Sequence, residues 1–161
     1  MKKILALTAV LLTALTIETY AIGLGLQAGG NTLTGFDDLG LSILISPNEQ
    51  LHGAVTWYIR SEGVALGGSA DYWVLPIALT KLGPGDLLFF VGGGVYARIS
   101  IWEGEFGLGA GLRLPIGLDW RTGSIDAFIQ AVPHAGLGIL PSPGFDRFYV
   151  DLNLGARFWF G

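Results

Sequence analysis

The chain has 161 residues, of which 51% are hydrophobic, only 14% are charged and 26 are glycine. This composition indicates one folded domain and excludes a disordered chain, which would be poor in apolar residues and rich in charge. The absence of cysteine excludes disulfides, thiol catalysis and zinc–thiolate sites, and a net charge of −4 without any basic run excludes a nucleic-acid partner.

The first 21 residues have the layout of a secretory signal peptide. Lys2 and Lys3 precede an apolar run from Ile4 to Ile17, and Ala21 offers a small residue for cleavage. A transmembrane helix is disfavoured because a run of about 14 residues is shorter than the ~20 needed to cross a bilayer. We therefore expect residues 1–21 to be a cleaved signal peptide and residues 22–161 to be the mature domain, exported from the cytoplasm.

Beyond the signal, apolar and polar residues alternate with the period of two that is typical of β-strands. In the last segment, Phe148, Val150, Leu152 and Leu154 lie in one set, whereas Asp151, Asn153 and Arg157 lie in the other. The same pattern predicts eight strands, which are Ile22–Gly30, Leu39–Ser46, Leu51–Arg60, Val64–Val74, Leu88–Trp102, Glu105–Trp120, Ile125–Ile139 and Phe148–Phe160. Pro115 and Pro133 fall inside strands, where we expect bulges because proline cannot donate to the ladder.

The links between these strands are short and carry turn residues such as Pro47-Asn48, Gly83-Pro84-Gly85 and Thr122-Gly123. Strands joined so tightly must be antiparallel neighbours. The sequence therefore predicts an all-β fold, an eight-stranded antiparallel up-and-down transmembrane β-barrel.

The two faces of the strands decide between two kinds of barrel. A soluble, lipocalin-type barrel places its apolar face inward, whereas an outer-membrane barrel places it outward. Here the polar face is rich in glycine and sparsely charged, which suits a crowded lumen better than a solvated surface. Tryptophan and tyrosine residues gather toward strand ends, as in the aromatic girdles of membrane barrels: Trp57, Tyr58, Tyr72, Trp73, Trp102, Trp120 and Trp159. These features favour the membrane barrel, with a soluble periplasmic binding barrel as the alternative.

An even number of strands leaves both termini on one side, which is the periplasm in bacterial barrels. The links at 31–38, 61–63, 102–104 and 141–146 are then expected to face outward. An aromatic residue near the C-terminus, here Phe160, is the usual signal read by the barrel-assembly machinery, which we expect to be a partner together with outer-membrane lipid.

Three segments carry a resemblance to a known family: Gly111-Leu-Arg-Leu-Pro-Ile-Gly117, Asp126-Ala-Phe-Ile-Gln-Ala-Val-Pro133 and Gly155-Ala-Arg-Phe-Trp-Phe160. They resemble the C-terminal half of small OmpA/OmpX-like barrels described in spirochaetes and other diderm bacteria, largely without assigned function. The resemblance implies an eight-stranded barrel in the cell outer membrane, and it implies no chemistry.

The charged residues of the mature chain fall mostly on the inward register. We predict a structural network in the lumen made of Asp71, Arg98, Glu105, Arg113, Asp119, Asp126, Gln130, His134, Asp151 and Arg157. Arg98 and Glu105 are expected to face each other diagonally near the outer end, and Asp71 is a candidate partner of Arg113. Because an eight-stranded barrel is just wide enough for side chains to fill it, we expect a plugged lumen, with a gated ion or proton path as the alternative.

Other candidates for chemistry are weak. His52 and His134 are the only histidines and are expected to lie apart, so we predict no metal site; His134 is expected to bond to Asp151 or Asn153. No serine, histidine and carboxylate are expected at one height on adjacent strands, so we predict no enzyme activity and no cofactor. The glycine-rich stretch Gly92–Gly94 lies within a strand, which disfavours a phosphate-binding loop.

The sequence thus favours a structural or surface-interaction role, with an extracellular partner that it does not identify. A narrow pore or transporter of small solutes is the runner-up.

Overall fold

The computed structural model describes residues 22–32, 35–45, 50–61, 63–74, 76–145 and 148–160. The predicted signal peptide, residues 1–21, lies outside the described residues. The strands are β1 (Ile22–Asn31), β2 (Gly35–Ile45), β3 (Leu51–Arg60), β4 (Gly63–Trp73), β5 (Ile77–Leu82), β6 (Gly85–Trp102), β7 (Glu105–Arg113), β8 (Ile116–Thr122), β9 (Ile125–Leu140), β10 (Gly144–Phe145) and β11 (Tyr149–Phe160). In the described part of the chain no helix is long and apolar enough to cross a membrane.

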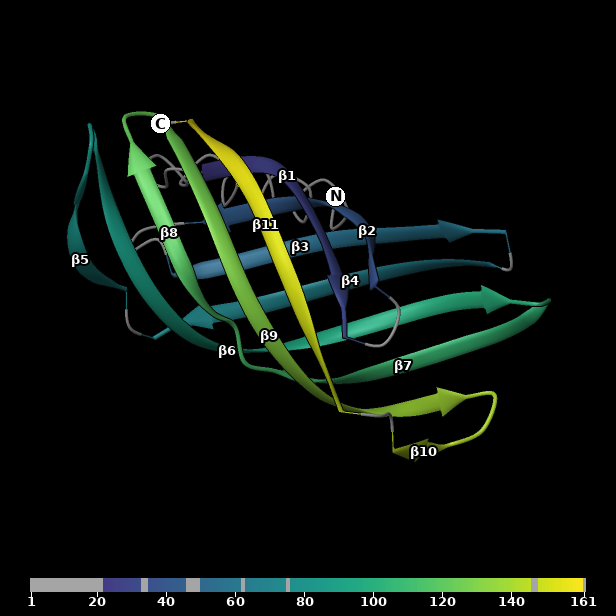
Figure 1. The fold of residues 1–161 in the computed structure, drawn as a ribbon. Helices are drawn as coiled ribbons and strands as arrows, with labels where there is room; N and C mark the ends of the chain where they lie inside the picture. The colour runs from purple at the N-terminus through teal and green to yellow at the C-terminus, as the bar shows by residue number, and fades with distance from the viewer. Residues whose placement is uncertain are drawn as a thin grey trace, which may run out of the picture.

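The strands close into a ring of eight positions, because β1 pairs antiparallel with both β2 and β11 (Figure 1). The ring runs β1–β2–β3–β4–β6, then β7 and β8 in one position, then β9 and β11. The predicted eight-stranded antiparallel barrel is therefore confirmed. The short strands β5 and β10 pair only with β6 and β9, and the alternation pattern predicts neither of them.

The prolines interrupt the ladder without shifting it. Residues 114 and 115 separate β7 from β8, yet Arg113 pairs with His134 and Ile116 pairs with Ala131, so the register is unchanged. Pro115 lacks an N–H, but its carbonyl oxygen accepts a hydrogen bond from the Gly92 amide at 2.8 Å. The pairing of β9 with β11 also runs in register through Pro133. The prediction of bulges at both prolines is therefore wrong.

The barrel has two distinct ends. The hairpins β3–β4 and β6–β7 project from one end, called here the hairpin end, and the C-terminus and the β8–β9 turn lie at the other, called the terminal end (Figure 1). The β6–β7 turn consists of Glu103 and Gly104, both with positive φ (49° and 85°), which gives the twist that favours two-residue hairpins.

Side chains segregate by face. Large apolar residues are exposed along the outside of the ring, among them Leu26, Ile59, Leu112, Leu152 and Leu154. Polar and charged side chains are buried inside, among them Ser42, His52, Asp71, Asp119, Asp126 and Arg157. This is the reverse of a soluble barrel and the arrangement that the alternation predicts.

Candidate functional site

Charged side chains gather inside the barrel toward the terminal end. The register places Arg157 of β11 opposite Asp126 of β9, and Asp126 opposite Arg121 of β8, so opposite charges face each other on three neighbouring strands. Arg157 Nε donates to Asp126 Oδ1 at 2.8 Å, and Arg157 Nη2 lies 3.6 Å from Asp119 Oδ1. Arg121 Nη2 lies 2.7 Å from Asp119 Oδ2. Both carboxylates are fully buried, so these cations compensate charges that would otherwise be costly to bury.

Asp71 is the centre of a second cluster. Its Oδ1 lies 3.0 Å from Nε of Arg113, the partner that the sequence suggests, and its Oδ2 lies 3.2 Å from Nδ1 of His52. All three residues are at most 7% exposed. His52 lies on β3, which pairs with β4, and Arg113 lies on β7, on the other side of β4 beyond β6.

The same cluster contains the arrangement of a hydrolase triad. Ser42 Oγ lies 3.0 Å from His52 Nε2, while His52 Nδ1 contacts Asp71, and the three residues stand on the adjacent strands β2, β3 and β4. The expectation that no serine, histidine and carboxylate meet on adjacent strands is therefore wrong. With the His52 Nδ1 proton directed to Asp71, the Ser42 hydroxyl donates to Nε2, which is the relay used to activate a nucleophile. Ser42 and His52 are, however, fully buried.

Side chains from opposite strands touch across the lumen in this half. The guanidinium of Arg157 on β11 lies 5.4 Å from the ring centre of Trp73 on β4, and His52 on β3 makes an edge contact with Phe128 on β9 at 5.9 Å. In the ring order, β4 and β11 are four positions apart in either direction, and so are β3 and β9. Side chains from diametrically opposite strands therefore come within contact distance across the lumen at this level.

Trp73 is central to this packing. It stacks on Phe90 with ring centres 3.8 Å apart and planes at 11°, and with Leu44 it forms the buried hydrophobic core, against which Trp159 packs. Trp73 is fully buried, so its assignment to an aromatic girdle is wrong. Tyr72, its neighbour in sequence, points outward and is 52% exposed, as a girdle residue would be.

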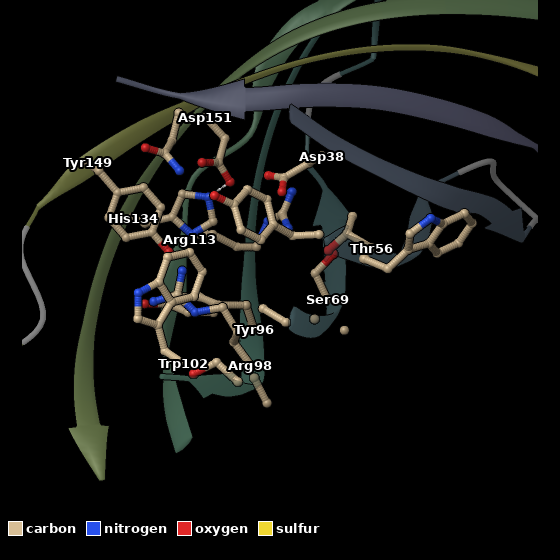
Figure 2. A pocket seen from close by; sticks show the side chains of 18 residues that line it. Asp38, Thr56, Ser69, Tyr96, Arg98, Trp102, Arg113, His134, Tyr149 and Asp151 are labelled. Atoms are coloured by element: carbon tan, nitrogen blue, oxygen red, sulfur yellow. Dashed lines mark ion pairs between the residues drawn. The ribbon is translucent and has the colours of Figure 1, made fainter. Parts of the chain in front are cut away.

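The hairpin half of the lumen instead holds a cavity of about 320 Å³ (Figure 2). His134 lines it, with Nε2 2.7 Å from Asp151 Oδ2, one of the two partners predicted for it. His134 also stacks on Tyr149 with ring centres 4.7 Å apart, and it meets Tyr96 edge-to-face with ring centres 4.9 Å apart. Arg98 and Asp38 line the same cavity.

The remaining predicted residues lie in different places. Arg98 pairs with Gly109 and Glu105 pairs with Trp102, so Arg98 and Glu105 are not diagonal neighbours, and Glu105 is exposed at the hairpin tip. Gln130 is 1% exposed, and neither side-chain amide atom has a hydrogen-bond partner among the described residues. No group of three or more potential metal ligands occurs in the described ranges.

No protein-family model matches the chain, and no curated protein matches it significantly. Among solved structures, it is similar to the N-terminal β-barrel domain of Pseudomonas aeruginosa OprF, with 13% identity and a TM-score of 0.55 over 87% of this chain and 97% of that one. The fold is that of a small outer-membrane-type barrel. Neisserial surface protein A (17% identity, TM-score 0.47, 88% and 96% covered) and Ail of Yersinia pestis (14%, 0.38, 88% and 96%) also match.

Proposed function

We propose that the protein is an integral barrel of the cell outer membrane with a structural or surface-interaction role and a lumen closed in its terminal half. The observation that carries the proposal is the segregation of the side chains. Ile59 is 73% exposed, and Leu26 and Leu112 are each 66% exposed, on strands spread around the ring, while charged groups are buried inside. Water would not favour such a surface, whereas a bilayer would.

The proposed orientation places the terminal end in the periplasm and the hairpin end outside the cell. Both termini of a barrel with an even number of strands share one side. The exposed aromatic pair Phe158 and Phe160, with ring centres 5.0 Å apart, ends the last strand and would present the C-terminal signal to the barrel-assembly machinery. Outer-membrane lipid would then contact the apolar outer face, and an extracellular partner would meet the hairpin end.

Fractionation tests the location directly. The protein should sediment with outer membranes, run faster on gels before boiling than after it, and expose a tag inserted between Pro141 and Asp146 to antibody on intact cells. A protein recovered in the soluble periplasmic fraction, with no heat-dependent change in mobility, would support the alternative of a soluble binding barrel and refute the membrane proposal.

Closure of the lumen is tested by solute flux. The contacts between β4 and β11 and between β3 and β9 predict that vesicles containing the protein do not swell in isosmotic arabinose. Swelling at a rate comparable to that of a porin control would favour the runner-up function, a pore for small solutes.

We also propose that the Ser42–His52–Asp71 relay is structural and does not catalyse hydrolysis, because Ser42 Oγ sits where no substrate can reach it. A fluorophosphonate probe, which labels activated serines, should not label the folded protein, and Ser42→Ala should leave it equally unlabelled. Labelling of the wild type that Ser42→Ala abolishes would identify a hydrolase instead.

A further inference from the structure

The cavity in the hairpin half has its own chemistry, separate from the clusters that close the terminal half. Figure 2 shows carboxylates of Asp38 and Asp151 on one wall and the side chains of Arg98 and Trp102 on another, with His134 between them. A volume of about 320 Å³ is at the small end of the range for small-molecule sites. The hairpins β3–β4 and β6–β7 build the wall that carries Thr56, Ser100 and Trp102.

Most charged groups of this cavity already have a polar or oppositely charged partner. Asp151 contacts His134 at 2.7 Å and Arg113 contacts Asp71 at 3.0 Å, while Asp38 lies near both the like charge of Asp151 and the opposite charge of Arg98. A ligand with a full charge would have to break one of these pairs in a partly desolvated site. The balance of charge therefore favours a ligand that is polar and uncharged.

Hydroxyl groups are arranged around the cavity with room kept for them by glycine. A Cβ added at Gly67 would lie 2.8 Å from Thr56 Oγ1, and a Cβ added at Gly107 would lie 2.5 Å from Ser100 Oγ. Ser69 Oγ is buried against the cavity with no hydrogen-bond partner among the described residues. Ser69 Oγ itself is not solvent-accessible, so the hydroxyls offered to a ligand are those of Thr56 and Ser100.

Aromatic rings supply the other half of the site. Tyr58 and Trp102 stack at 5.9 Å with planes at 27°, on the inner side of neighbouring hairpins. Trp102 is 38% exposed and lines the cavity. The electron-rich face of an indole attracts the weakly positive C–H groups on the apolar face of a sugar ring.

We propose that this cavity binds a saccharide of one or two rings, which stacks on Trp102 and hydrogen-bonds with the hydroxyls of Thr56 and Ser100. The proposal rests on the proposed function only for the side of the membrane from which a ligand enters. In an outer-membrane barrel of the orientation given above, the site is open to the cell exterior. Binding itself requires only the folded barrel.

Saturation-transfer NMR on the folded protein in a detergent without a sugar headgroup tests the site. The probes are glucose, galactose, N-acetylglucosamine, maltose and lactose, each titrated alone. At least one should receive saturation on its ring C–H protons, and Trp102→Leu should weaken its affinity at least tenfold. Phe106→Leu is the matched control, because Phe106 is exposed on the outer face of the same hairpin, and it should bind as the wild type does.

Each variant is first shown to keep its heat-dependent gel mobility, so that a loss of binding is not a loss of fold. Thr56→Val and Ser100→Ala together provide a second, milder test and should weaken binding several-fold. Lactose and a lactosyl lipid in mixed micelles separate the two sources. Transfer to lactose alone indicates a free sugar, transfer to the lactosyl lipid alone indicates a headgroup, and either transfer should be lost in Trp102→Leu.

Two outcomes would overturn the proposal: no transfer to any of the five sugars, or transfer that Trp102→Leu leaves unchanged. Tetramethylammonium and alanine are titrated as well, and transfer to one of them alone would assign the cavity to a cation or a zwitterion. Failure here with correct outer-membrane fractionation leaves the proposed function standing, whereas a soluble protein that still binds sugar refutes the location and keeps the site.

Discussion

The two halves of the lumen are built on the same ring of strands and yet differ in what fills them. In the terminal half the inward positions carry large side chains, including Trp73, Phe90, Phe128 and Arg157, and these meet across the axis. In the hairpin half glycine takes inward positions on β4 and β7, at Gly67, Gly107 and Gly109, and a cavity remains. The number of strands sets the width of a barrel, but the size of the inward residues decides where that width is filled.

The largest expected effect is the loss of a buried cation from the terminal half. Arg157→Ala leaves Asp126 and Asp119 without a major counter-charge and should lower the free energy of unfolding by about 3–5 kcal/mol. Arg98→Ala in the hairpin half removes an exposed side chain and should lower the free energy of unfolding by less than about 1 kcal/mol. Urea unfolding in lipid vesicles measures both, and equal losses would contradict the distinction between the halves.

The comparison concerns the inside alone, because both halves share one apolar outer face. Leu154→Arg, near the middle of β11, should cost about 2–4 kcal/mol, and Phe160→Arg, at the strand end, about 0–1 kcal/mol. Refolding equilibria in vesicles report these values. If the two substitutions lower the free energy of unfolding equally, the effect of a charge on the outer face does not depend on its depth in a bilayer.

A smaller effect separates two glycines. A Cβ at Gly117 in the terminal half would lie 2.3 Å from the Ile129 carbonyl oxygen and 2.7 Å from Phe90 Cζ. At Gly109 in the hairpin half, the atom nearest to an added Cβ is 3.4 Å away. Gly117→Ala should therefore cost about 1–3 kcal/mol. Gly109→Ala should change stability by less than about 0.5 kcal/mol. Thermal unfolding of the two variants side by side measures the difference, and a larger loss for Gly109→Ala would reverse the comparison.

The fold was predictable because a period of two is read directly from residue types. The alternation over β11 assigns Leu152 and Leu154 to the outside and Asn153 and Arg157 to the inside, and the structure agrees. Adjacency on neighbouring strands likewise sufficed to predict the contact of His134 with Asp151.

The features that the sequence did not predict depend on the register between strands and on how single side chains pack. The Ser42–His52–Asp71 relay requires the offset of β2 against β3, which the residues of a turn do not determine. Residue type alone assigns Trp73 to the membrane interface, although it shares the inward parity of Asp71, and its burial against Phe90 follows from that parity. The cavity arises from side-chain volumes summed around a ring, which no single strand reveals.

Single-channel recording in planar bilayers tests the central claim most directly, since the claim is that side chains from opposite strands close the terminal half. The purified wild-type protein at neutral pH should insert without steps of conductance, while a porin control in the same membrane conducts. Large, stable, ion-selective channels from the wild type would contradict the contacts of Arg157 with Trp73 and of His52 with Phe128 as a closed barrier.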